Sequence, residues 1–167
     1  WQRVNIAERL VRDYLGERGV RASYKIEDVG FRTQRLTNVV IGDPANPDVT
    51  ARLIAINLNI GFGAPNIRSV WAEGLRLKGR FADGKLFLGE LDKFRDMAST
   101  APFAIPDMNV ALRDAAISLA TPWGGLGLAL EGQGHLQRSF AGNAALRSNA
   151  LTGAGCKGKS LRFDGKF

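Results

Sequence analysis

Few residues of this sequence have the types and spacing that catalysis requires. His135 is the only histidine, and no serine or cysteine nucleophile motif surrounds it. A lone histidine in that setting is typical of a surface or edge residue rather than of a general base. Cys156 is also alone, so the sequence contains no disulfide framework.

The acidic and glycine-containing motifs have structural explanations. Asp43 and Asp48 flank a proline-containing loop, where turn formation accounts for them better than calcium binding. The Gly-Phe-Gly at 61–63 is a single glycine pair, which a turn explains, and it lacks the context of a dinucleotide fingerprint. Glu90 and Asp92 lie where a helix begins, and there they favour the helix dipole. The sequence therefore predicts no enzyme, no cofactor and no metal site.

The charge of the chain is strongly basic, with a formal net charge of +7 and a pI near 10.1. Nucleic acid, an anionic membrane surface, an acidic partner or ordinary solvated charge would each match it. The basic residues are scattered and form no compact cluster interleaved with aromatic residues, so nucleic acid is not indicated as a partner. No apolar run approaches the roughly 20 residues that span a bilayer.

The secondary structure that the sequence predicts is mainly β-strand. Residues 75–91 predict a β-hairpin with an Asp83-Gly84 turn, one apolar face and one charged face. Residues 53–60, 67–77, 108–112, 115–120 and 126–130 predict further strands, and residues 42–48 an irregular loop. The apolar positions of the hairpin are Leu75, Leu77, Phe81, Leu86 and Leu88, and the basic positions are Arg76, Lys78 and Arg80.

Two helices are predicted beside these strands. Residues 1–18 form an amphipathic helix by their 3.6-residue periodicity, and a short helix is expected near 89–98. Packing on the sheet accounts for the apolar stripe of the first helix. The alternative is that it caps the open end of the sheet beside a membrane, where Trp1 and Arg3 would suit the interface.

A weak internal repeat runs through the chain. Short rungs with two apolar residues two positions apart begin near residues 38, 74, 116 and 160, at intervals of roughly 36 to 44 residues. Such units bury their apolar face only against neighbours. The last rung leads into Asp164-Gly165, which predicts a turn after one arm of a hairpin. We therefore expect residues 19–167 to be a repeating β segment, cut at both ends from a longer protein.

The order of these elements resembles the N-terminal region of AsmA-like proteins, most closely their YdbH branch, which is related to TamB. The resemblance covers most of residues 3–131 and is carried by the stretches at 22–31, 36–43, 51–58 and 70–77. It implies a mainly β fold of the α+β class. In that fold a curved antiparallel sheet forms a groove, the β-taco of chorein-like, bridge-like lipid transfer proteins.

The resemblance also implies a cellular location and a transported ligand. The protein would lie in the periplasm of a Gram-negative bacterium, anchored in the inner membrane by a helix that precedes Trp1. It would carry phospholipid acyl chains along the groove towards the outer membrane, with a periplasmic or outer-membrane protein as a further partner. The residues expected to line the groove are Leu75, Leu77, Phe81, Leu86, Leu88, Ile117, Leu119, Leu126, Leu128 and Leu130.

Two other functions stay open. The sheet could be a scaffold or interaction module that assists outer-membrane assembly, with its apolar face filled by protein and no lipid cargo. A basic domain for polyanions is the third hypothesis, and steep loss of binding with salt would identify it. The apolar face separates the first two hypotheses. A closed core under the N-terminal helix favours the scaffold, and an open trough favours lipid.

Overall fold

The computed structural model describes residues 12, 15–29, 33–59, 66–94, 107–148, 150–153, 156–158 and 160–167. The described part is mainly β, as expected, with a single short 3₁₀ helix, η1 (Gly89–Phe94), and a helical turn at 15–17. The strands are β1 (Ala22–Val29), β2 (Thr33–Asp43), β3 (Asn46–Asn59), β4 (Asn66–Glu73), β5 (Arg76–Ala82), β6 (Lys85–Phe87), β7 (Asn109–Thr121), β8 (Gly124–His135), β9 (Ala141–Ser148), β10 (Leu151–Gly153), β11 (Cys156–Gly158) and β12 (Leu161–Lys166).

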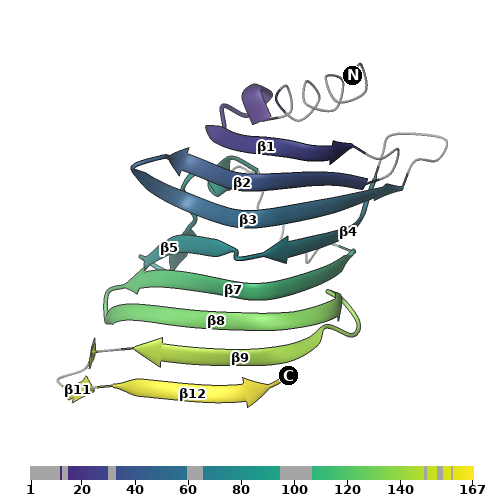
Figure 1. Ribbon diagram of the computed structural model, residues 1–167. Helices are drawn as coiled ribbons and strands as arrows, with labels where there is room; N and C mark the ends of the chain where they lie inside the picture. The colour runs from purple at the N-terminus through teal and green to yellow at the C-terminus, as the bar shows by residue number, and fades with distance from the viewer. Residues whose placement is uncertain are drawn as a thin grey trace.

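One large sheet contains all of these strands except β10 and β11, which pair with each other (Figure 1). Its order is β1-β2-β3-β4-β7-β8-β9-β12, and β5 lies in line with β4 between β3 and β7. The expectation of a purely antiparallel sheet is wrong, because β7 runs parallel to both β4 and β5. The connection after β6 returns the chain to the end of the sheet where β4 begins, so β7 starts in the same direction as β4.

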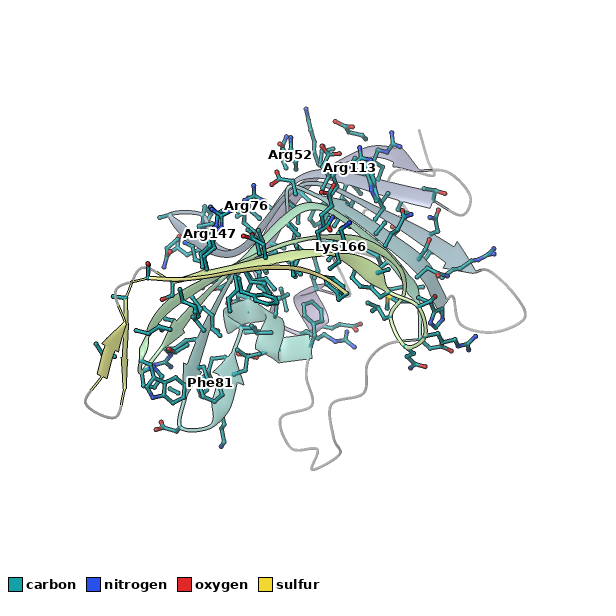
Figure 2. All side chains as sticks on the ribbon, turned by 90° about the horizontal axis from the view of Figure 1, so that it is seen from below. Arg52, Arg76, Phe81, Arg113, Arg147 and Lys166 are labelled. Atoms are coloured by element: carbon teal, nitrogen blue, oxygen red, sulfur yellow. The ribbon has the colours of Figure 1, made fainter. Side chains whose placement is uncertain are left out.

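A line of backbone irregularities crosses four neighbouring strands, and we call it the crease. Its members with a positive φ are Asn38 in β2 (50°), Gly74 between β4 and β5 (64°) and Asp114 in β7 (52°). Arg52 of β3 completes the line, because it lies opposite Asn38 and its guanidinium reaches Asp114. Irregularities of this kind bend strands and increase twist. Figure 2 shows the resulting curvature of the sheet.

The crease also changes which residues face the core. Leu36 and Val39 are three positions apart, so an undisturbed strand would place them on opposite faces. Both are nevertheless buried in one cluster with Ala51, at 6% and 5% exposure, because Asn38 between them has a positive φ. Tyr24, Ile26, Ile54 and Leu75 are among the partly buried side chains that pack against this cluster.

Several local predictions can be compared with these elements. The hairpin of residues 75–91 is confirmed as β5 and β6, joined at Asp83 and Gly84, whose φ angles are both positive as a two-residue type I′ turn requires. The short helix is present as η1, and residues 95–98 lie outside the described residues. The predicted helix over residues 1–18 also lies mostly outside them, including Trp1 and Arg3.

Four local predictions are wrong. The strand at 67–77 is two strands, because β4 ends at Glu73 and β5 begins at Arg76, with Gly74 at a positive φ between them. The irregular loop at 42–48 is a tight turn at Pro44 and Ala45, where the Asp43 carboxylate accepts a hydrogen bond from the main-chain N–H of Ala45 at 2.9 Å. The strands at 108–112 and 115–120 are one strand, β7, interrupted only by the crease. Asp164-Gly165 forms no turn and pairs with Ala145 and Ala144 inside β12, because pairing with β9 overrides the local turn propensity.

Candidate functional site

The register of the large sheet aligns apolar side chains in a continuous row. Residues that pair directly across neighbouring strands point to the same face of a sheet. Successive pairs connect one residue in each of eight strands, from β1 to β12, and we call this line the apolar row. Its members are Ala22, Ile41, Val49, Leu77, Ile117, Leu128, Leu146 and Phe163.

The residues predicted to line a groove gather on this face. Leu77, Ile117 and Leu128 belong to the apolar row itself. The remaining pairs place Leu119 opposite Leu126, Leu130 opposite Ala115 and Phe81 opposite Leu86, at positions that alternate onto the same face. A side chain at Gly79 would touch both Leu88 and Leu119, and Leu75 packs against the buried cluster of Leu36, Val39 and Ala51.

The predicted groove residues omit five members of the row, which are Ala22, Ile41, Val49, Leu146 and Phe163. Leu146 follows two alanines in β9 and precedes Arg147, so the sequence there does not alternate, and Phe163 is the apolar end of the last rung. Their pairing with each other joins the C-terminal strand to the row. Alternation was a usable signal for Phe163, which Arg162 and Asp164 flank, but only the strand order shows that Leu146 and Phe163 continue a line begun in β1.

The opposite face of the sheet is polar. One position to one side of the apolar row is a row with Arg76, Ala116, Ala129, Ala145 and Asp164, and one position to the other side is a row that includes Lys78, Arg147 and Arg162. Figure 2 shows Arg52, Arg76 and Arg147 on the convex side of the curved sheet and Phe81 on the other side. The sheet thus separates charge from apolar surface.

The apolar face is covered at one end by η1, which contacts β2 and β3. The Glu90 carboxylate holds this helix in place. It accepts hydrogen bonds from the main-chain N–H of Arg21 at 3.1 Å and from Lys93 Nζ at 2.7 Å. The main-chain N–H of Glu90 donates to Asp48 at 2.9 Å. The Lys93 ammonium lowers the pKa of Glu90 below its usual value, against an opposing effect of burial.

Exposure along the apolar row differs between its two ends. Val49 is 4% exposed, and the cluster of Leu36, Val39 and Ala51 lies next to it. Towards β12 the side chains of Leu128 and Leu146 are partly exposed, and Phe163 is 62% exposed. Among the described residues, the buried side chains of β2 and β3 include Leu36, Val39 and Val49, whereas Ala115 is the one buried apolar residue from β7 to β12, where apolar surface remains accessible.

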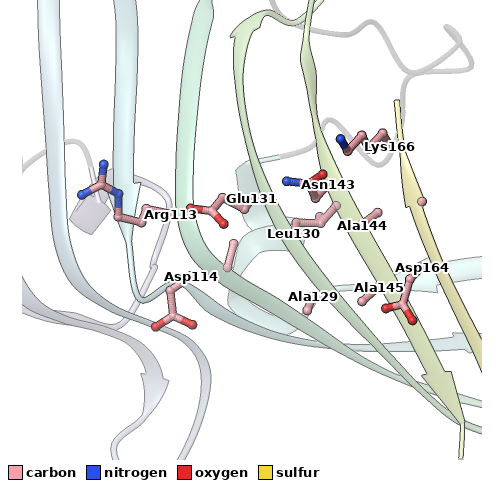
Figure 3. Close-up of a pocket in the computed structure, with 12 residues that line it drawn as sticks. Arg113, Asp114, Ala129, Leu130, Glu131, Asn143, Ala144, Ala145, Asp164 and Lys166 are labelled. Atoms are coloured by element: carbon pink, nitrogen blue, oxygen red, sulfur yellow. The ribbon is translucent and has the colours of Figure 1, made fainter.

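A shallow hollow of about 700 Å³ lies against β7, β8, β9 and β12 (Figure 3). Ala129 and Ala145 form part of its floor, and charged and amide side chains surround them. Positive and negative groups occur together around the rim, so the hollow favours neither an anion nor a cation. The rim residues with polar side chains are Arg113, Asp114, Glu131, Asn143, Asp164 and Lys166.

His135 lies at the end of β8, with a side chain 19% exposed. Its Nε2 is 2.8 Å from the Asp107 carboxylate. The small hollow beside it is lined by Ile67, Arg68, Met108, Asn109 and Arg138, none of which is a nucleophile. Within the described residues there is also no cluster of acidic, histidine or cysteine side chains that could hold a metal ion.

No protein-family model matches the chain, and no curated protein matches it. In the part of the chain that the structure describes, no helix has the length and apolar character needed to cross a bilayer. The two chemically different faces of the sheet are therefore the features of the molecule that indicate its function.

Proposed function

We propose that this chain holds phospholipid acyl chains on the apolar face of its sheet and lets them move along the apolar row. The observation that supports this most directly is the row itself, which presents one apolar residue in each of eight paired strands between β1 and β12. The resemblance to AsmA-like proteins implies the same activity. We further propose that the bend at the crease makes the apolar side the interior of a groove.

Physical chemistry explains how such a face would bind lipid without catalytic groups. An acyl chain lying along the row would meet an apolar side chain about every 4.8 Å, the spacing of neighbouring strands. Each buried CH₂ group contributes about 0.8 kcal/mol, and this contribution has no preferred register along the row. Binding would therefore be firm while sliding remained possible. Arg76, Lys78 and Arg80 project from the other face of β5, where they would attract anionic headgroups at the rim.

In the complete protein, we propose that this segment lies at the inner-membrane end of a periplasmic path towards the outer membrane. The basic charge of the chain is consistent with contact with anionic lipid. In this proposal the predicted helix at 1–18 lies next to the membrane and lipid enters near it.

Native mass spectrometry followed by organic extraction tests the proposal. Ile117→Asp places a charge in the apolar row, whereas Ser118→Asp places the same charge one residue away on the polar face of β7. We expect phospholipid at near-stoichiometric occupancy in the unmodified chain and in Ser118→Asp, and its loss in Ile117→Asp. Circular dichroism must show that both variants are folded. A folded, unmodified chain without lipid after incubation with phospholipid would contradict the proposal.

A second function, the scaffold with no lipid cargo, is favoured by one observation. The described helix η1 already covers part of the apolar face over β2 and β3, so protein can occupy the place of lipid there. If protein covers the rest of the face in the same way, Ile117→Asp and Ser118→Asp will differ in stability but neither chain will carry lipid. The extraction experiment therefore separates the two functions.

A further inference from the structure

Two neighbouring turns at one end of the sheet present aromatic side chains to solvent. The rings of Phe81, at the end of β5, and Trp123, in the turn between β7 and β8, are stacked with centroids 6.0 Å apart. Trp123 is 51% exposed, and Leu86, which pairs with Phe81, is 41% exposed. Figure 2 shows Phe81 far from the convex, arginine-bearing side of the sheet. We call Phe81, Leu86, Phe87 and Trp123 the aromatic tip.

The backbone beneath Trp123 is held firmly although its ring is exposed. Its N–H donates to the Thr121 hydroxyl at 3.2 Å, and its carbonyl accepts a hydrogen bond from the N–H of Thr152 at 2.7 Å. Thr121 also donates to the carbonyl of Gly124 at 2.7 Å, which closes the turn. A rigid turn that presents a large ring loses little conformational entropy on binding. The turn is therefore ordered by hydrogen bonds and holds Trp123 in an exposed position.

Cations lie beside the aromatic tip. The guanidinium of Arg80 lies over the ring of Phe87 at 5.0 Å from its centroid, and Lys85 begins β6 with an exposed side chain. The turn between β5 and β6 contributes one opposing charge, Asp83. Tryptophan and phenylalanine with neighbouring lysine and arginine are the residues that favour the boundary between lipid acyl chains and headgroups.

We propose that the aromatic tip docks the chain on the surface of an anionic lipid bilayer. Trp123 and Leu86 would enter the boundary between headgroups and acyl chains, and Arg80 and Lys85 would pair with anionic headgroups. Phe81 and Leu86 also belong to the apolar face, so the docked tip would join the bilayer to that face without a polar gap. The docking does not require lipid to be held on the apolar row, so it is separable from the proposed function.

Flotation with vesicles tests the docking. Vesicles of phosphatidylcholine, alone or with about one third phosphatidylglycerol, are mixed with the 167-residue chain and centrifuged through a density gradient. We expect flotation with the anionic vesicles, at least about tenfold weaker partition for Trp123→Ser, and a similar loss for Arg80→Glu combined with Lys85→Glu. Flotation of the unmodified chain should fall with added salt.

Phe167→Ser is the matched control. Phe167 is 50% exposed and stacks on Phe140 at 5.7 Å, so it equals Trp123 in exposure and ring contact but lies outside the aromatic tip. We expect Phe167→Ser to float like the unmodified chain. Equal losses for Phe167→Ser and Trp123→Ser would show nonspecific adhesion and overturn the proposal. If the unmodified chain floats with neither vesicle type, the proposal is also overturned, and a protein partner for the tip is indicated.

The two proposals can fail independently of each other. Ile117→Asp should lose extracted lipid and keep flotation, because Ile117 lies in the apolar row and not in the aromatic tip. Trp123→Ser should lose flotation and keep lipid that is supplied in detergent.

Discussion

The guanidinium of Arg76 in β5 binds the carboxylate of Asp114 in β7 through both oxygens. Nη2 lies 2.9 Å from one oxygen and 3.0 Å from the other, and Nη1 donates to the main-chain carbonyl of Asp114. Arg52 of β3 donates to the same carboxylate at 3.1 Å. The residue whose positive φ interrupts β7 is thus tied to two other strands, and the crease is held together by charge as well as by backbone conformation.

We expect the two roles of Asp114 to separate in substitution experiments. Asp114→Asn keeps a side chain that tolerates a positive φ and should lower the free energy of unfolding by at most about 1 kcal/mol, because the partners are about half exposed. Asp114→Val removes the charge and also strains the backbone, and should cost about 2–3 kcal/mol. Urea denaturation measures both. Equal losses would mean that the backbone conformation contributes little.

Gly74, the one glycine of the crease, should not tolerate a side chain. Its φ is 64°, and a Cβ at this position would collide with the side chain of Arg52. Gly74→Ala should therefore lower the free energy of unfolding by about 1–3 kcal/mol. Gly125→Ala is the control, since a Cβ there meets nothing within 4 Å and its φ is not in the left-handed region. If the two variants unfold at the same urea concentration, the crease is not a structural requirement.

Stability should fall in acid through Glu90. Its pKa is lower in the folded chain than the ordinary value near 4.5, chiefly because of Lys93, so the carboxylate form is favoured by folding. Its contribution is fully present above about pH 4.5 and is lost as the pH falls through the lowered folded-state pKa. Melting temperatures measured between neutral pH and about pH 3 should show this loss, and Glu90→Gln should reduce the dependence. An unchanged profile in Glu90→Gln would contradict the assignment.

Two leucines should report where the core lies. Leu36 is 6% exposed within the buried cluster, so Leu36→Ala should lower the free energy of unfolding by about 2–4 kcal/mol. Leu128, in the apolar row, is only partly buried, so Leu128→Ala should cost about 1 kcal/mol in lipid-free chain. Chemical denaturation of both variants compares them directly. A loss at Leu128 as large as that at Leu36 would mean that the row is already covered by protein.

Much of the fold could be predicted from alternation, and the limits of prediction are specific. Period-two patterns located the hairpin of β5 and β6, because Asp83-Gly84 is a strong local turn signal. The parallel placement of β7 depends on a long connection that leaves no local signal. The same applies to Asp164 and Gly165, whose turn propensity yields to pairing with β9.

The candidate site was predictable as a set of residues but not as an arrangement. Leu77 could be selected because charged residues flank it, and Ile117 and Leu128 because each alternates with small residues or serine. The strand register is needed to see that these residues form one row. The crease shifts the register near Asn38 and Asp114, so a simple alternating pattern would place the side chains beyond it on the wrong face. The aromatic tip had no sequence signal, because Trp123 and Phe81 meet only when two separate turns lie side by side.

The length of the apolar row depends on the number of paired strands, and β12 has an outer edge at which a further strand could pair. The N–H and carbonyl of Phe167 both bond to Gly142, so those of Arg162, Asp164 and Lys166 alternate to the side away from β9. From β1 to β12 the row measures about 34 Å, close to the roughly 30 Å hydrocarbon thickness of a bilayer. A strand paired to that edge would add about 4.8 Å without changing any existing contact. Each added strand would therefore lengthen the apolar row by the same fixed amount, whatever the surface binds.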